Sequence, residues 1–105
     1  MLVLVTPEAE RQIAAIQAWW REHRKSAPNL FAEELASGLD LVARLPRAGR
    51  RRRHHSVPGL RRLLLRSSRY HVYYAQANDS LFVLAIWNAH RGTGPDLSQL
   101  SLASS

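Results

Sequence analysis

The chain has 105 residues, a formal net charge of +7 and no cysteine. This length fits one domain with one hydrophobic core, and the absence of cysteine excludes both a disulfide framework and thiolate chemistry. No apolar run approaches the ~20 residues of a membrane span, and the opening residues lack the regions of a signal peptide, so we expect a folded cytoplasmic protein. The positive charge favours an anionic partner such as nucleic acid, an anionic membrane or an acidic protein.

A short apolar run, Leu2 to Val5, opens the chain and predicts a strand. Thr6, Pro7 and Glu8 then supply an N-cap hydroxyl, a first-turn proline and an acid near the positive end of a helix dipole. Apolar residues follow at helical spacing, which places them on one face of a first helix. The members of that face are Ala9, Ile13, Ile16 and Trp20. Trp19 flanks this face.

A second helix is predicted by the pattern of LFAEELASGLDLVARLP, which begins at Leu30 and is stopped by Pro46. Ser26 or Asn29 is expected to cap it. Its apolar face consists of Phe31, Leu35, Leu39 and Val42. Because the connection between the two helices is short, they are expected to form an antiparallel hairpin.

The stretch from Arg47 to Gly59 holds two glycines, a proline and a block of arginines, and it reads as a loop rather than a buried element. Three strand candidates with short turns between them follow. They are Leu60 to Arg66, Arg69 to Gln76 and Leu81 to Trp87. The predicted fold is therefore a single α/β domain of the α+β type over residues 1–97, with the helical hairpin packed on a small antiparallel sheet that ends in a three-stranded meander. Residues 98–105 are expected to form a tail.

The last predicted strand is unusual because Leu81 to Trp87 is apolar at every position. In an antiparallel sheet with helices on one face, the residues on the other face should be polar. Either the sheet curls enough to shelter both faces, or a partner segment covers the second face. The strand runs directly into His90 and Arg91, after which Gly92, Gly94 and Pro95 turn the chain away.

Three segments of the sequence occur in a characteristic order: FAEELASGLDLVARLPRAGRR, GLRRLLLRSSRYHVYYA and VLAIWNAHRGTGPDL. In this order and spacing the chain, from about Leu2 to Leu97, resembles the RelE/ParE superfamily of type II toxin–antitoxin toxins, on the ParE side. The resemblance implies a small toxin neutralised by a cognate antitoxin, whose acidic or amphipathic segment wraps it. One branch of the superfamily poisons DNA gyrase, and the other cleaves messenger RNA in the ribosomal A site.

The resemblance implies that three residues take part in RNA cleavage in the ribonuclease branch. They are an arginine after the tyrosine of the second meander strand, an arginine at the end of the third meander strand, and a tyrosine shortly after it. Here His71 follows Tyr70, Arg91 is present, and residues 92–100 contain no tyrosine. His71 or His90 could serve as acid or base, since an ordinary imidazole titrates near pH ~6.5, or both could be structural. A gyrase inhibitor that acts by binding is therefore favoured. The alternatives are an endoribonuclease that uses Arg91, His90 or His71, and a degenerate, non-toxic member.

Two sets of candidate residues follow from the resemblance and the pattern. The candidate target-binding residues are Arg61, Arg62, Arg69, His90 and Arg91. The candidate antitoxin-binding residues are Trp19, Phe82, Leu84 and Ile86. The block Arg50 to Arg53 indicates either a phosphate-binding site or a solvated loop. Adjacent His54 and His55 should point apart in an extended chain, so no metal site is expected, nor any cofactor or membrane partner.

Overall fold

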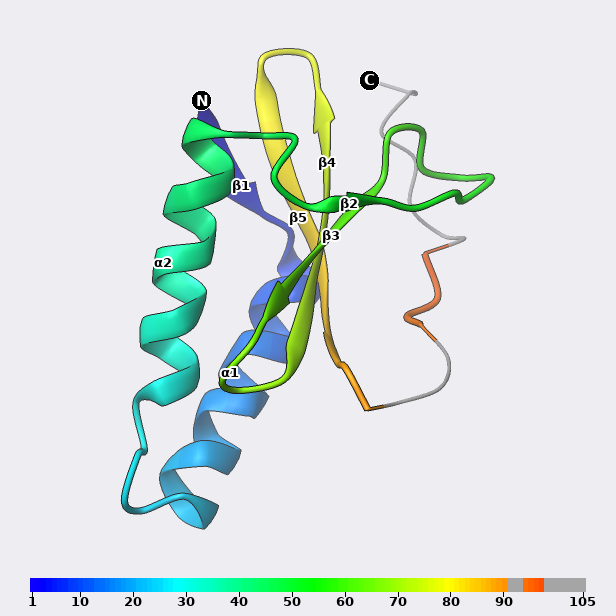
Figure 1. The fold of residues 1–105 in the computed structure, drawn as a ribbon. Helices are drawn as coiled ribbons and strands as arrows, with labels where there is room; N and C mark the ends of the chain where they lie inside the picture. The colour runs from blue at the N-terminus through cyan, green and yellow to red at the C-terminus, as the bar shows by residue number, and fades with distance from the viewer. Residues whose placement is uncertain (91–93, 98–105) are drawn as a thin grey trace.

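A computed structural model gives the fold and describes residues 1–90 and 94–97 (Figure 1). In chain order the elements are β1 (Leu2–Val5), α1 (Pro7–His23), α2 (Leu30–Arg44), β2 (Arg50–Arg51), β3 (Arg61–Leu65), β4 (Tyr70–Ala77) and β5 (Ser80–Asn88). The predicted α+β fold is confirmed, and the bounds of the predicted strands agree with the structure to within one residue.

The strands form one five-stranded sheet in the order β1-β5-β4-β3-β2. The meander β3-β4-β5 is antiparallel as predicted, but β1 lies beside β5 and pairs with it in parallel, so the sheet is mixed rather than wholly antiparallel. A further difference is β2, which pairs with β3 inside the stretch predicted to be a loop. The two arginines of β2 show no alternation of apolar and polar residues, and β2 pairs with β3 through backbone groups.

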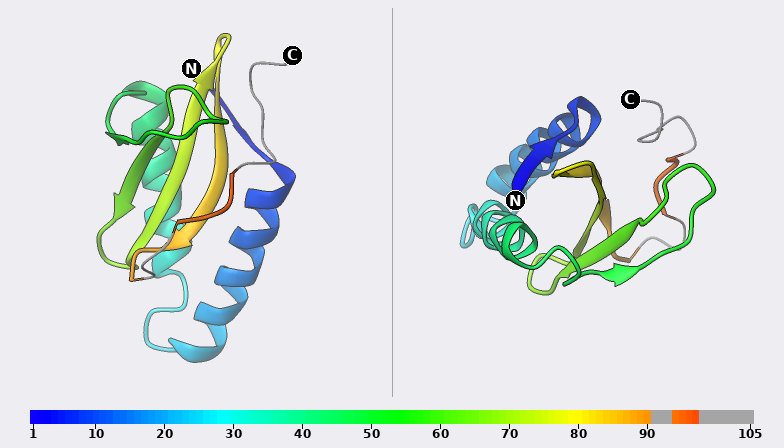
Figure 2. Two further views of the ribbon diagram at one scale, coloured as in Figure 1. Left: turned by 90° about the vertical axis from the view of Figure 1, so that its right-hand side faces the viewer. Right: turned by 90° about the horizontal axis from the view of Figure 1, so that it is seen from above.

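Both helices cover the same face of the sheet, in antiparallel directions (Figures 1 and 2). The predicted apolar faces of α1 and α2 meet the sheet there, and Asn29 occupies the N-cap of α2 without a side-chain cap bond. This first core cluster consists of Ala9, Trp20, Phe31, Leu35, Val42, Leu65, Tyr70, Val72, Tyr74, Leu81, Val83 and Ile86. Trp20 is buried and its indole Nε1 donates to the Tyr70 hydroxyl at 3.3 Å, whereas Trp19 remains exposed beside the predicted stripe.

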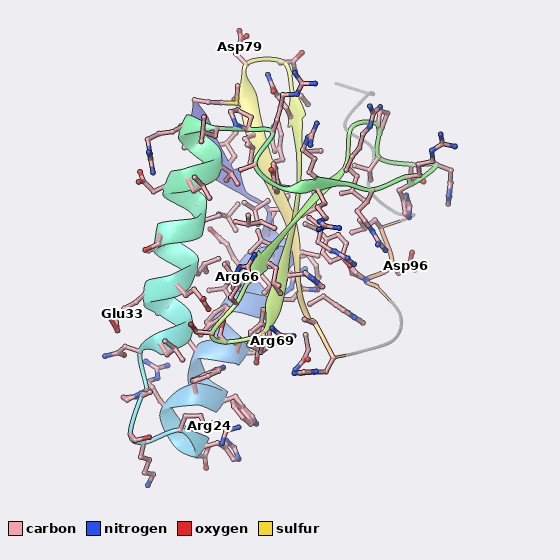
Figure 3. The ribbon with its side chains drawn as sticks, in the orientation of Figure 1. Arg24, Glu33, Arg66, Arg69, Asp79 and Asp96 are labelled. Carbon is pink, nitrogen blue, oxygen red and sulfur yellow. The ribbon has the colours of Figure 1, made fainter. Side chains whose placement is uncertain are left out.

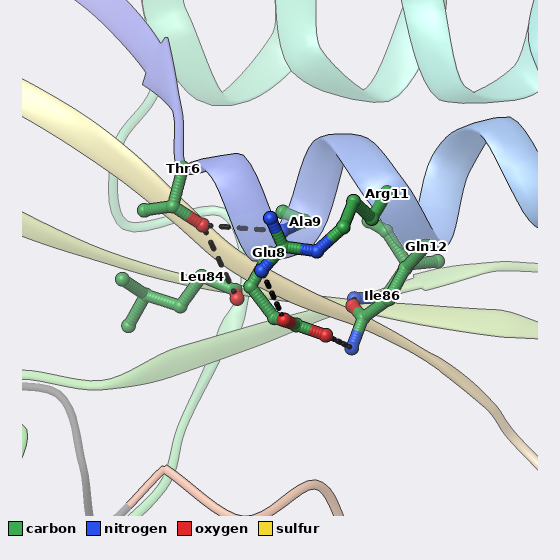
Figure 4. A network of polar contacts seen from close by, with 7 residues as sticks. All are labelled: Thr6, Glu8, Ala9, Arg11, Gln12, Leu84 and Ile86. Carbon is green, nitrogen blue, oxygen red and sulfur yellow. Dashed lines mark hydrogen bonds and ion pairs between the residues drawn. The ribbon is translucent and has the colours of Figure 1, made fainter.

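The start of α1 continues the hydrogen bonding of β1 along the edge of β5 (Figure 4). The Thr6 hydroxyl caps the helix by accepting from the Ala9 N–H at 3.3 Å, and the Thr6 N–H donates to the Val83 carbonyl at 3.1 Å. Beyond the end of β1, the Gln12 side chain accepts the Ile86 N–H at 2.7 Å. The helix thus satisfies backbone groups of β5 that β1 is too short to reach.

The strand β5 is apolar throughout because both of its faces are buried, and it contains a β-bulge. Tyr74 is opposite Val83 but Tyr73 is opposite Ala85, so Leu84 is the extra residue. Side chains on both sides of β5 are buried. Those facing away from the helices join a second cluster, which consists of Val57, Leu60, Tyr73, Ala75, Leu84, Ala85 and Leu97, with Phe82 and Trp87 packed against it.

The second cluster decides between the two explanations for the apolar strand. Val57 and Leu60, from the loop before β3, and Leu97, after β5, are buried against the face of the sheet that the helices leave uncovered, here called the outer face. Segments of the chain itself therefore cover part of the outer face, so the apolar strand by itself does not indicate a partner.

The connection from α2 to β2 is fixed by one buried tyrosine. The Tyr74 hydroxyl donates to the Pro46 carbonyl at 2.8 Å and accepts from the Gly49 N–H at 2.7 Å. A Cβ atom on Gly49 would lie 2.7 Å from that hydroxyl, so this close approach requires glycine. Arg61 completes the anchor, because its guanidinium donates to the Gly49 carbonyl at 2.8 Å.

Glu34 of α2 holds the turn between β3 and β4. Its carboxylate accepts from the N–H groups of Ser67 and Ser68, each at 2.8 Å, and from the Ser68 hydroxyl at 2.6 Å. Burial opposes ionisation of this carboxyl, but the hydrogen bonds outweigh it and hold the pKa of Glu34 below its ordinary value. The turn and the helix are thereby fixed to one another.

Candidate functional site

The outer face carries a cavity of about 360 Å³ near the β2 edge of the sheet, here called the arginine hollow. Its lining residues are Ala48, Gly49, Arg50, Arg62, Leu63, Leu64, Arg66 and His71. Arg50 of β2 lies directly opposite Arg62 of β3, and Arg62 in turn lies opposite Tyr73 of β4, which belongs to the second cluster on the outer face. Register alone thus brings two arginines from separate strands side by side.

His71 forms the inner wall of the arginine hollow. On the outer face it lies between Leu64 of β3 and Trp87 of β5, its partners in the sheet register. Burial lowers the pKa of His71, and the positive charges of Arg62, Arg52 and Arg69 lower it further. Burial and the nearby positive charges therefore both favour the neutral form of the imidazole.

The turn between β3 and β4 carries two arginines, Arg66 and Arg69 (Figure 3). Arg66 lines the cavity, and Arg69 adopts a left-handed backbone conformation with φ of 66°. The Arg69 backbone is well held, because its N–H donates to the Leu65 carbonyl and its carbonyl accepts from the Ala89 N–H, both at 2.8 Å.

The structure divides the predicted target-binding residues. Arg62 and Arg69 lie near His71, but Arg61 pairs with Tyr74, whose side chain belongs to the helix-covered core, and its guanidinium anchors the loop at Gly49. His90 is exposed just beyond β5, and its N–H donates to the Asn88 side chain at 2.8 Å. Arg91 lies outside the described residues.

A second hollow, of about 470 Å³, lies between α1 and the end of β5 and is here called the Trp19 groove. Its lining residues are Gln12, Ala15, Ile16, Trp19, Tyr70, Ile86, Trp87 and Asn88. The Trp19 side chain is 41% exposed; its ring stacks on His23 with centroids 4.7 Å apart, and the Arg24 guanidinium lies 5.5 Å from the ring centroid. The groove thus combines apolar walls with a cationic rim.

The predicted antitoxin-binding residues divide between the two faces of the sheet. Trp19 and Ile86 both line the Trp19 groove, although Ile86 is 3% exposed. Leu84 is fully buried in the second cluster, and half-buried Phe82 packs against that cluster. Leu84 therefore lies beneath the chain's own cover, and the bulge places Ile86 on the opposite face from Phe82 and Leu84, which simple alternation could not reveal.

The loop before β3 surrounds a more open hollow of about 810 Å³. Its lining residues are Arg51, Arg52, Arg53, His54, His55, Val57, Pro58 and Gly59. The rings of His54 and His55 stack with centroids 4.7 Å apart, so the expectation that they point apart is wrong. The chain turns at this point and brings the two rings together. Within residues 1–90 and 94–97, no group of three or more histidine or acidic side chains has the arrangement of a metal site.

Sequence reasoning left Arg66 out and treated Arg50 as part of a loop block. The signal for Arg66 was its place at the end of a predicted strand, next to Ser67 and Ser68. The pairing of Arg50 with Arg62 left no signal, because a two-residue edge strand has no periodicity.

With this geometry in place, comparisons with known proteins identify the family. The family model described as "ParE toxin of type II toxin-antitoxin system, parDE" matches residues 3–92. The chain therefore belongs to the ParE toxin family, as the sequence resemblance predicted. A comparison with curated proteins gave no match.

A solved structure has the same fold. A chain titled "Chromosomal ParDE TA system from P. aeruginosa" superposes with a TM-score of 0.70 at 19% sequence identity, over 86% of this chain and 97% of that one. At this identity the likeness concerns the fold alone. In the part of the chain that the structure describes, neither helix is long and apolar enough to cross a membrane.

Proposed function

We propose that this protein is the toxin of a type II toxin–antitoxin pair, that it acts in the cytoplasm by inhibiting DNA gyrase, and that a cognate antitoxin neutralises it. The observation that carries the proposal is membership of the ParE toxin family over residues 3–92. The solved relative is titled as a ParDE toxin–antitoxin system, which supports an antitoxin as the partner here.

The arrangement of titratable groups favours action by binding. RNA cleavage by 2′-hydroxyl attack needs a base for that hydroxyl and an acid for the leaving oxygen. His71 supplies one group, but His90 is exposed beyond the end of β5, and the hydroxyls of Tyr70 and Tyr74 are engaged within the helix-covered core. Residues 92–100 supply no tyrosine.

The Trp19 groove is the proposed antitoxin site. Its apolar walls suit the apolar face of a bound segment, and Trp19 is the residue type most often found at the energetic centre of an interface. Arg24 beside the ring gives the rim a positive charge that suits an acidic segment.

The test is to express the chain alone in a bacterial host and to follow DNA synthesis and translation by pulse labelling over the first minutes. We expect DNA synthesis to fall first, with induction of the DNA damage response. Purified protein should inhibit supercoiling by gyrase, and the double variant His71→Ala/His90→Ala should retain this inhibition because neither imidazole is needed for binding.

The position of His71 supports an endoribonuclease as the second candidate. A neutral imidazole surrounded by arginines could accept a proton beside a phosphate. If translation falls before DNA synthesis, and His71→Ala abolishes toxicity, the ribonuclease function replaces the gyrase proposal. If neither process responds, the protein is a non-toxic family member.

A further inference from the structure

We propose that the arginine hollow is a binding site for the phosphodiester backbone of a nucleic acid, with Arg50, Arg62 and Arg66 as the phosphate-binding residues. The proposal goes beyond gyrase inhibition and does not depend on it, since it concerns direct contact between this chain and a nucleic-acid strand.

The fold tolerates a repulsion between like charges at this site. Arg50 and Arg62 are direct cross-strand partners in the β2–β3 pair. Like charges opposite one another destabilise a sheet, so an anion bound between the two guanidinium groups would relieve this repulsion. The same pair lines the cavity, which leaves space for that anion.

Charge is distributed unevenly along the chain. Residues 41–78, which include β2, β3 and the whole of β4, contain ten arginines and no aspartate or glutamate. Six of the eight acidic residues lie on α1 and α2, whose side of the sheet is opposite the hollow. The ion pairs of the helices, Arg11 with Glu8 and Arg44 with Asp40, join neighbours on a single helix. The arginines of the hollow are therefore placed for an external anion.

The spacing of the arginines favours a phosphodiester over an acidic peptide. Three guanidinium groups come from three separate segments, β2, β3 and the turn after β3, and line one cavity. A single carboxylate is matched by one planar guanidinium, whereas a chain of phosphates offers oxygens to several cations at successive positions. The row Leu64, His71 and Trp87 continues from the hollow across the outer face, and its two ring-bearing residues provide a surface for a base.

The experiment measures fluorescence anisotropy of labelled twelve-nucleotide probes with the full chain. The probes are single-stranded DNA, RNA and duplex DNA of one sequence, and they separate the possible sources of the phosphate. The test variant is Arg50→Ala/Arg62→Ala. The matched control is Arg21→Ala/Lys25→Ala, which removes the same net charge from exposed positions at the end of α1 and in the following loop.

We expect the test variant to lose at least about tenfold in affinity for the best probe, and the control to lose much less. If the best probe is single-stranded, the slope of log affinity against log salt should fall by about 1.4, the contribution of two phosphate contacts. Because a bound phosphate would favour the imidazolium, the pKa of His71, measured by NMR, should rise when the probe is added.

Two outcomes would overturn the proposal. One is equal loss of affinity in the test and control variants, which would mean that only net charge attracts the probe. The other is competition by poly-glutamate as effective as that of unlabelled nucleic acid, which would assign the hollow to an acidic protein. Thermal unfolding of each variant checks that the fold is retained. Supercoiling assays test the gyrase proposal and do not measure binding to these probes, so either proposal can fail alone.

Discussion

At the scale of single residues, the contacts that fix the loop before β2 could not be predicted from the sequence. Gly49 was expected in a loop for its freedom of conformation, but its role comes from the Tyr74 hydroxyl that occupies the space of its missing Cβ. Tyr74 lies 25 positions further along the chain, so local pattern carries no trace of this contact. Arg61 was predicted to bind the target, yet its guanidinium donates to the carbonyl of the same glycine.

The substitution Tyr74→Phe should destabilise the protein by about 1–3 kcal/mol, because it leaves the buried Gly49 N–H without its acceptor. The Pro46 carbonyl loses its donor at the same time. Urea denaturation of wild type and variant measures the free energy of unfolding. A difference below about 0.5 kcal/mol would show that water or a small shift of the loop replaces the hydroxyl.

At the scale of elements, the sequence predicts what depends on periodicity and misses what depends on pairing. The apolar stripes of α1 and α2 and the β-branched and aromatic residues of β4 identify those elements directly. The parallel pairing of β1 and the short strand β2 leave no periodic signal. The same limit applies to the site, where His71 and Arg62 were identified as candidates but their closeness to Arg50 and Arg66 required the register.

The contact between Glu34 and the β3–β4 turn gives a pH-dependent prediction. The pKa of Glu34 is lower in the folded protein than its ordinary value of 4.5, so its contribution to stability is present above that value and is lost as the pH falls through the folded pKa. Glu34→Gln should therefore be less stable than wild type near neutral pH, and the difference should shrink below about pH 4.5.

Urea denaturation between about pH 3 and 7 measures this difference. Glu33→Gln is the matched control, because Glu33 lies next in sequence on α2 and is exposed. A gap between wild type and Glu34→Gln that stays constant across the acidic range would contradict the assignment.

At the scale of the whole molecule, the two candidate surfaces lie toward opposite edges of the sheet. The Trp19 groove is bounded by α1 and the end of β5, whereas the arginine hollow lies at β2 and β3. The two linings share no residue, although Trp87 of the groove also ends the row that continues from the hollow across the outer face. Mutations of lining residues other than Trp87 at one surface should leave the other intact.

Trp19→Ala should weaken antitoxin binding by at least about 2 kcal/mol, close to thirtyfold, if Trp19 is an energetic anchor of the groove. The same variant should bind the nucleic-acid probes as wild type does. Titration calorimetry with the antitoxin and anisotropy with the probes measure the two affinities. Parallel loss of both would indicate damage to the fold or one shared surface.

The bulge at Leu84 also has a consequence for how the length of this chain can vary in evolution. Before the bulge Val83 faces the helices, and after it Ile86 does, so removing Leu84 would restore simple alternation without moving any later side chain to the other face. Deletion of a residue before Leu84 or after Ala85 would exchange the helix-facing and outward-facing residues along part of the strand. In an alignment of relatives, Leu84 is the position of β5 where we expect a one-residue gap.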